Sequence, residues 1–226
     1  MELKGKIIDF LGDSITEGVG VADRAANRFD HVILREYGLA AVHNYGVGGT
    51  RIAHQSVPSE KPRHDLCFCG RVYDISREAD IVVVYGGVND YIHGDAPIGK
   101  MGDTTPATFH GGVYFLMYYL TKEFKAKGKT VVFITPAHCY LHGVSDAVPS
   151  PRACKKPDAM PLVGYGDIIK ETAKQFDIPV LDFYHDLPLD PHDPEIKQKY
   201  TADGLHFNDA GHQVLAHTIG DFLLSL

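Results

Sequence analysis

The chain has 226 residues, of which 44% are hydrophobic and 23% are charged. This composition is that of an ordinary globular protein with a core of its own, and it excludes a disordered polar chain, a collagen and a disulfide-stabilised miniprotein. The formal charge is −7 with histidine neutral. Because negative charge repels polyanions, we expect a small, weakly charged or neutral ligand rather than nucleic acid or an anionic membrane.

The chain carries no recognisable targeting segment. The apolar stretch at residues 7–11 is too short for a signal-peptide core, and no small-residue cleavage site follows it. No apolar run approaches the length of a membrane span. Four cysteines are too few for a disulfide framework in a chain of this length. We therefore expect a cytoplasmic protein with reduced thiols.

Strand-like and helix-like segments alternate along the chain. In chain order the expected elements are a strand over 6–11, a helix over 25–36, a strand over 41–45, a helix over 71–78, a strand over 80–85, a helix over 112–127, a strand over 129–135, a helix over 162–175, a strand over 178–183 and a helix over 210–226. Short apolar runs separated by helices indicate parallel pairing through right-handed crossovers. The pattern predicts one domain over 1–226, an α/β fold built as a three-layer α/β/α sandwich around a five-stranded parallel sheet.

Such sheets bind ligands beyond the carboxyl ends of their strands. Gly-Asp-Ser follows the first expected strand at 12–14, Gly-Val-Gly-Gly the second at 46–49, and Gly-Gly-Val-Asn-Asp the third at 86–90. A long, proline-containing connection at 136–161 follows the fourth. Long connections in compact domains are commonly functional, so we expect the site at this edge.

Ser14 has two interpretations. At a strand-to-helix junction its hydroxyl can act as a nucleophile beside free backbone N–H groups that stabilise an oxyanion. The sequence Ser-Ile-Thr-Glu at 14–17 also fits a capping box, in which serine and glutamate only satisfy the first amides of a helix. This segment alone favours the cap.

A second candidate group lies near the C-terminus, where Asp203 precedes His206 by three residues. The carboxylate can orient the imidazole, which leaves the other ring nitrogen free to accept a serine proton. The alternative is an Asp-Gly turn followed by a surface histidine and a helix cap.

Asn89 and the Gly48-Gly49 pair are candidate oxyanion donors. The Asn89 side-chain amide follows the third strand, and the glycines allow close approach to a backbone N–H. Both segments also fit ordinary turns or caps.

The four segments together, in this order, resemble the SGNH hydrolases, also called GDSL-type esterases and acylhydrolases. The resemblance rests on Gly-Asp-Ser-Ile-Thr at 12–16, Asn-Tyr-Gly-Val-Gly-Gly at 44–49, Gly-Val-Asn-Asp at 87–90 and Asp-Gly-Leu-His at 203–206. It implies the flavodoxin-like fold of that family and an ester hydrolase that needs no cofactor and no metal.

The resemblance also implies a role for each residue. Ser14 would be the nucleophile, His206 the general base and acid, and Asp203 the carboxylate that orients it. The backbone N–H groups of Ser14 and Gly49 with the Asn89 amide would form the oxyanion hole. Gly48 competes with Gly49 for this place, and the family's spacing from Asn44 favours Gly49.

The substrate is expected to be a small soluble acyl ester, with O-acetyl groups of carbohydrates as one candidate. Pocket walls are expected from the loops at 91–109, 136–161 and 184–200, with Arg51, Tyr91, His93 and His138 as candidate substrate-binding residues. The sequence carries no signal for the oligomeric state.

Two other hypotheses remain open. The first is a catalytically silent module of the same fold that binds a carbohydrate or an ester. The second is a metal-dependent deacylase that uses loop histidines, suggested by His-Cys-x-x-His at 138–142, Cys-x-Cys at 67–69 and His185. No second ligand pair has zinc-site spacing, so scattered thiols and loop histidines are favoured over a metal site.

Overall fold

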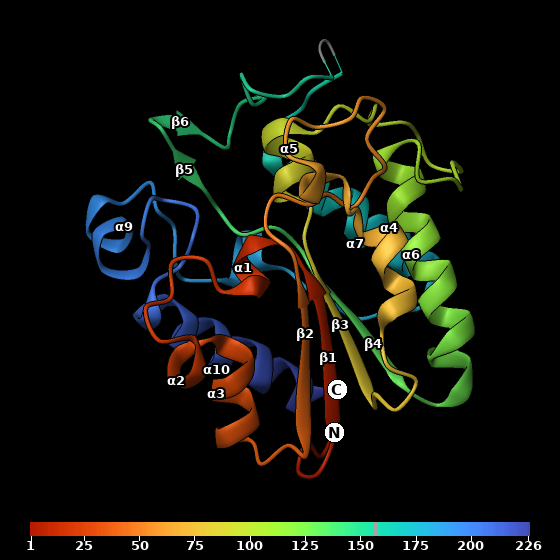
Figure 1. The fold of residues 1–226 in the computed structure, drawn as a ribbon, viewed down its shortest axis with the longest axis vertical. Helices are drawn as coiled ribbons and strands as arrows, with labels where there is room; N and C mark the ends of the chain where they lie inside the picture. The colour runs from red at the N-terminus through yellow and green to blue at the C-terminus, as the bar shows by residue number, and fades with distance from the viewer. Residues whose placement is uncertain (156–157) are drawn as a thin grey trace.

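A parallel sheet of five strands, in the order β2-β1-β3-β4-β7, forms the centre of the protein (Figure 1). The computed structural model describes residues 1–155 and 158–226. The strands of this sheet are β1 (Ile7–Gly12), β2 (Ala41–Gly46), β3 (Ile81–Tyr85), β4 (Thr130–Ile134) and β7 (Val180–Leu181). All neighbouring pairs are parallel. The predicted α/β fold with a five-stranded parallel sheet is confirmed.

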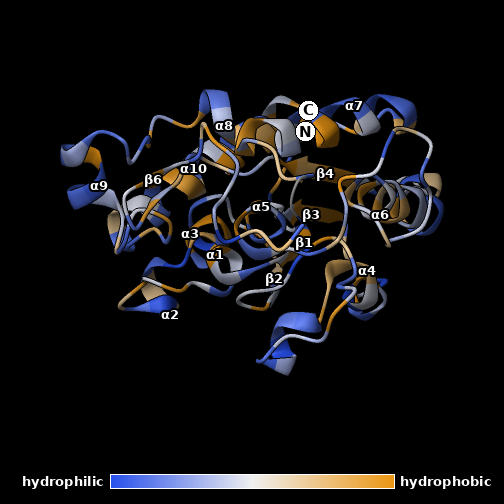
Figure 2. Ribbon diagram, turned by 90° about the horizontal axis from the view of Figure 1, so that it is seen from above, coloured by the Kyte–Doolittle hydropathy of each residue, from blue (hydrophilic) through white to orange (hydrophobic). Residues whose placement is uncertain are grey.

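Helices cover both faces of the sheet because its central strands are apolar on both sides. In β3, Val82 and Val84 pack into one hydrophobic cluster, whereas Ile81 and Val83 pack into the other. The first cluster includes α4 (Phe68–Arg71), α6 (Phe109–Glu123) and α7 (Leu162–Phe176). The second includes α3 (Phe29–Glu36) and α10 (Asp209–Ser225). Figure 1 shows the two sets on opposite sides of the strands, and Figure 2 shows apolar residues gathered between the layers.

The remaining elements are short and lie mainly at the ends of the strands. They are α1 (Ser14–Glu17), α2 (Arg24–Asn27), α5 (Val88–His93), α8 (Phe183–Asp186), α9 (Pro194–Tyr200), the hairpin of β5 (Tyr140–Leu141) and β6 (Val144–Ser145), and 3₁₀ turns at Pro62–Asp65, Val72–Asp74 and Lys125–Lys127. Within the described residues, no helix combines the length and the apolar character that crossing a membrane requires.

Two predicted helices differ from the structure. The helix expected over 25–36 is two helices, because Arg28 between them has an extended backbone (φ −62°, ψ 135°). The prediction of a helix over 71–78 is wrong. The helix α4 ends at Arg71, a 3₁₀ turn follows it, and the backbone of Ile75 is extended. There the backbone N–H of Ser76 donates to the Asp9 carboxylate (2.9 Å) and not to a helical carbonyl. A long-range partner thus replaces the helical hydrogen bond.

The fifth strand is shorter than expected and pairs with β4 through only two residues, since α8 begins at Phe183. The two chain ends lie together. The Met1 amino group donates to the Leu224 carbonyl (2.7 Å), and both ends lie away from α1 and α5 (Figure 1).

Candidate active site

The turns after β1, β2 and β3 lie at one edge of the sheet, and a short helix is held tightly against them. α1 begins at Ser14, directly after β1, and packs on the end of β2. A Cβ at Gly46 would lie 2.2 Å from the Glu17 backbone nitrogen, so only glycine allows this approach. The N-cap of α1 is Asp13, whose carboxylate accepts the Ile15 N–H (3.0 Å). Ser14 is therefore not the cap that the capping-box interpretation required.

Ser14, His206 and Asp203 form a continuous line of hydrogen bonds. The Ser14 Oγ lies 2.9 Å from His206 Nε2, and His206 Nδ1 lies 2.7 Å from Asp203 Oδ2. The other carboxylate oxygen of Asp203 accepts the backbone N–H groups of Leu205 (2.9 Å) and His206 (2.8 Å). The turn between the last two elements thus fixes both the acid and the ring that it orients.

Two carboxylates of the site differ in their protonation because their surroundings differ. Burial opposes ionisation of Asp203, but the hydrogen bonds from the His206 ring and backbone prevail and lower its pKa to about 2. Asp13 lies deeper, and its burial raises its pKa to about 6 against the hydrogen bond from Ile15. Near neutral pH, Asp203 is the fully ionised partner that can stabilise an imidazolium.

Three potential oxyanion donors line the same cleft as Ser14 and His206. The Gly48 N–H is already committed to the Glu17 carboxylate (2.6 Å). The Gly49 N–H has no acceptor within the described part of the chain, and the Gly49 backbone is left-handed (φ 79°). Asn89 at the start of α5 is buried, and its Nδ2 donates to the Thr50 carbonyl (3.0 Å). Gly48, Gly49 and Asn89 all contact the cleft.

The cleft is open and has a volume of about 570 Å³. Its lining comes from residues in the segments 14–24, 48–49 and 61–64, from α5, from the loop between β4 and α7, and from the turn at 203–206. Cationic side chains at the cleft are Arg24, Lys61, Arg63 and Arg152, against the carboxylates of Glu17 and Asp203. The expected wall at 184–200 does not contribute to this lining. The wall at 61–64 was not predicted, although its Lys-Pro-Arg-His sequence is a concentration of basic groups.

Only one of the four candidate substrate-binding residues contacts the cleft, and that residue is His93. Arg51 is buried and donates to His93 and to the His64 carbonyl. Tyr91 is also buried, and its hydroxyl donates to the Val148 carbonyl (3.0 Å). His138 packs against Tyr184 at a ring-centroid distance of 3.9 Å.

The residues best arranged to hold a metal ion are His138, Asp146 and His192, whose ligand atoms all lie within 4.8 Å of one another. Each already has a protein partner. His138 Nδ1 contacts Asp146 (3.0 Å), and His192 contacts Ser145 (2.9 Å) and Asp190 (2.7 Å). The grouping also differs from the 138–142 pattern in the sequence, because His142 lies on the cleft instead.

Arg71 holds the strand ends together, and sequence patterning did not single it out. Its buried guanidinium donates to the carbonyls of Gly12 (3.0 Å) and Leu66 (2.8 Å), to the Thr50 hydroxyl (2.9 Å) and to the Tyr45 carbonyl. Burial lowers its pKa to about 10, so it stays charged at neutral pH. One cation thus joins the turns that carry Ser14 and Gly49.

Solved structures of other proteins share this fold. A protein from Lactobacillus plantarum is 27% identical, with a TM-score of 0.79 and 98% of each chain covered. An acetyl xylan esterase is 20% identical (TM-score 0.61, 96% of this chain and 98% of that one), and an aryl esterase of M. smegmatis is 16% identical (TM-score 0.66, 98% and 99%). These last two show the fold. No curated protein sequence matches the chain.

Fold and site together define a hydrolase of carboxylic esters. Residues 10–214 match the GDSL-like Lipase/Acylhydrolase family, and the chain belongs to that family. The predicted family and enzyme class are confirmed.

Proposed function

We propose that the protein hydrolyses small soluble acyl esters through an acyl-enzyme on Ser14. The observation that carries this proposal is the hydrogen-bond line from the Ser14 hydroxyl through His206 to Asp203 at the wall of an open cleft. A serine hydroxyl is a weak nucleophile unless a base removes its proton, and His206 Nε2 lies at the distance for that transfer.

The chemistry proceeds in two halves. Ser14 Oγ attacks the ester carbonyl carbon while its proton passes to His206 Nε2, and Asp203 stabilises the imidazolium. The tetrahedral oxyanion is held by the Asn89 amide and the backbone N–H groups of Gly49 and Ser14. On collapse, His206 returns the proton to the departing alcohol. Water then repeats the sequence on the acyl-enzyme, releasing the carboxylic acid and restoring the Ser14 hydroxyl.

Gly49 is preferred to Gly48 as the backbone donor. The Gly48 N–H donates to Glu17, whereas the Gly49 N–H is available at the cleft wall. This assignment agrees with the spacing from Asn44.

A fluorophosphonate probe tests the nucleophile. We expect one adduct, located at Ser14 by peptide mass spectrometry, and none in Ser14→Ala. Absence of labelling in the folded wild-type protein would overturn the proposal and favour the non-catalytic binding module. Hydrolysis that persists in Ser14→Ala and stops with a chelator would instead support the metal-dependent deacylase.

A substrate panel tests the ester class. Esters from acetyl to octanoyl, followed by acetylated sugars, should show fastest turnover with short acyl groups, and O-acetyl carbohydrates are the first candidates. The structural neighbour whose name states acetyl xylan esterase activity makes that group worth testing first. A preference for octanoyl over acetyl esters would contradict the proposed class.

Asn89→Ala tests the oxyanion hole. Loss of one donor should lower kcat by about 10²–10³-fold. Fluorophosphonate labelling at a reduced rate would show that the fold and nucleophile survive. Unchanged turnover would remove Asn89 from the site.

A further inference from the structure

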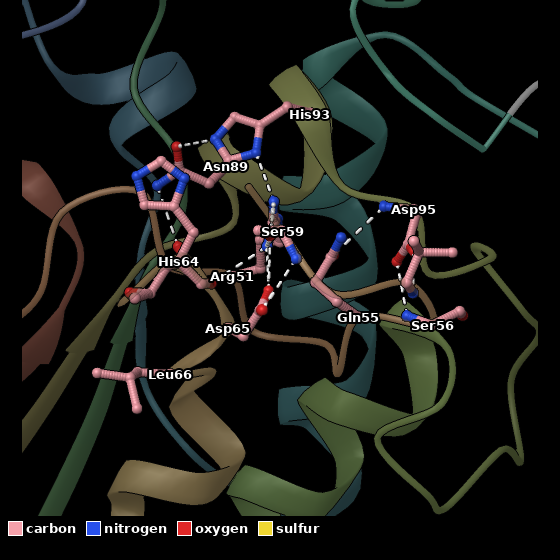
Figure 3. Close-up of polar contacts among 12 residues, drawn as sticks. Arg51, Gln55, Ser56, Ser59, His64, Asp65, Leu66, Asn89, His93 and Asp95 are labelled. Carbon is pink, nitrogen blue, oxygen red and sulfur yellow. Dashed lines mark hydrogen bonds and ion pairs between the residues drawn. The ribbon is translucent and has the colours of Figure 1, made fainter. Parts of the chain in front are cut away.

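Asn89 belongs to a chain of hydrogen bonds that continues through His93 to the buried Arg51 (Figure 3). Its Oδ1 lies 3.1 Å from His93 Nε2, one turn later on α5. On the other side of the imidazole, Arg51 Nη2 lies 2.8 Å from His93 Nδ1. The amide, the imidazole and the guanidinium are therefore in series.

The donor and acceptor of each bond follow from chemistry. A guanidinium has only donors, so His93 Nδ1 must accept from Arg51. In a neutral imidazole the proton is then on Nε2, which donates to Asn89 Oδ1. This directs the Asn89 carbonyl toward His93 and leaves Nδ2 with two N–H groups. One of them donates to the Thr50 carbonyl, and no residue in the described part of the chain accepts the other, so it can serve the cleft that Asn89 lines.

We propose that His93 and Arg51 are positioning residues that hold the Asn89 amide with its N–H, and not its carbonyl oxygen, toward the oxyanion. The inference rests on the proposed function, because it assigns a purpose to Asn89 as an oxyanion donor. A flipped amide would place an oxygen lone pair against the developing negative charge. The hydrogen bonds from Arg51 through His93 thus fix the orientation of the Asn89 amide dipole before substrate binds.

The imidazole is kept neutral by its surroundings. Burial is the main cause that lowers the pKa of His93 to about 3. Electrostatic repulsion from Arg51, and then from His64, Arg152 and Lys155, lowers the pKa further in the same direction. A neutral ring that accepts from a cation has one tautomer only. The direction of the bond to Asn89 is therefore the same throughout the neutral pH range.

The guanidinium itself is anchored at the unpredicted wall of the cleft. Arg51 Nη1 donates to the Ser59 hydroxyl (3.2 Å) and the His64 carbonyl (3.1 Å), and it lies 3.6 Å from the Asp65 carboxylate. Asp65 also accepts the Ser59 hydroxyl (2.6 Å). Figure 3 shows Asp65 on the opposite side of the Arg51 guanidinium from His93.

The helix that carries both Asn89 and His93 is fixed independently of this chain. The buried Asp90 carboxylate accepts the backbone N–H groups of Ile52 (2.8 Å) and Ala53 (3.0 Å). The buried Lys155 ammonium donates to the carbonyls of Asp90 and Gly94. Substitution of His93 should therefore release the Asn89 side chain without displacing α5.

A double-mutant cycle between positions 89 and 93 tests the proposal. His93→Leu should lower kcat by about 10–100-fold, at most the loss for a whole oxyanion donor, with KM within about twofold. His93→Gln keeps an acceptor for Arg51 and a donor for Asn89, so it should retain activity within about threefold. In an Asn89→Ala background, His93→Leu should have no further effect. His217→Gln, at an exposed histidine that contacts Glu36, is the control.

Nitrogen-15 NMR of the wild-type protein provides a readout that does not depend on any variant. We expect His93 to be neutral, with its proton on Nε2, at pH 7. The substitution Arg51→Met should raise the pKa of His93 and allow the His93 tautomer with its proton on Nδ1. A proton on Nδ1 alone, or an equal kcat loss with and without Asn89, would overturn the proposal. If Ser14 is not labelled by the fluorophosphonate, the proposed function fails instead, so the two failures are distinguishable.

Discussion

His212 leads to a quantitative prediction about acid stability. Its imidazole is fully buried in the first turn of α10 and stacks on the Phe29 ring with centroids 5.7 Å apart. Its Nδ1 accepts the Phe29 backbone N–H (3.2 Å). Burial is the main cause that lowers the pKa of His212 from 6.5 to about 4. Between these values the unfolded chain binds a proton that the folded protein does not, so stability is lost as the pH falls from 6.5 toward 4.

The size of this loss follows from the two pKa values. At about 1.4 kcal/mol per pH unit, the interval from 6.5 to about 4 corresponds to roughly 3 kcal/mol of unfolding free energy. For a chain of this length that amounts to a melting temperature lower by about 6–12 °C.

The perturbation is His212→Gln, because the glutamine oxygen can accept the same N–H and does not titrate. Urea unfolding of both proteins at pH 7.5, 6, 5 and 4 measures the difference. We expect the wild type to lose roughly 3 kcal/mol more than the variant over this range. His93 destabilises the folded state in acid with the same sign, but it is common to both proteins and cancels. Parallel curves for the two proteins would refute the reasoning.

Three further predictions concern Arg71, Gly49 and the cysteines. Arg71→Met should lower the free energy of unfolding by more than about 3 kcal/mol, measured in urea, since it leaves buried carbonyls without donors; a loss below about 1 kcal/mol would contradict this. Gly49→Ala should cost about 1–2 kcal/mol from its left-handed backbone, plus a clash with the His64 ring 2.3 Å away. Gly102→Ala has comparable strain (φ 99°) in open space and should leave activity intact, which Gly49→Ala should not. A thiol reagent should modify the exposed Cys154 in the folded protein and all four cysteines after unfolding, and fast reaction of more than one would be inconsistent with the burial of the others.

The sequence predicts the sheet well because buried parallel strands leave an unmistakable pattern. The run Ile-Val-Val-Val-Tyr of β3 is apolar at every position, as a strand covered on both faces must be. Once the strands are placed, the polar segments that follow them must converge at one edge. The helix expected over 71–78 failed because the pattern could not reveal the Asp9 carboxylate, 67 residues away in the sequence, that takes up a backbone N–H there.

The walls of the cleft were harder to predict than its centre. Residues 61–64 follow an irregular path, and irregular segments have no hydrophobic period to reveal where they pack. Arg51 was expected to be a substrate-binding residue, yet its guanidinium is buried and donates to His93 and Ser59 inside the protein. The net charge of −7 likewise did not indicate that four cations gather at this cleft. The net charge of a sequence does not specify the electrostatic field at one site, because it contains no information on where the charged side chains lie.

The meeting of the two chain ends, where Met1 contacts Leu224, has a practical consequence. Because the ends are adjacent and lie away from α1 and α5 (Figure 1), a short linker can join them. New ends can be opened at the exposed turn around Gly102. A circularly permuted enzyme of this kind should keep its turnover. Attachment of this chain to a solid support through residue 1 or residue 226 should likewise leave the cleft facing the bulk solution.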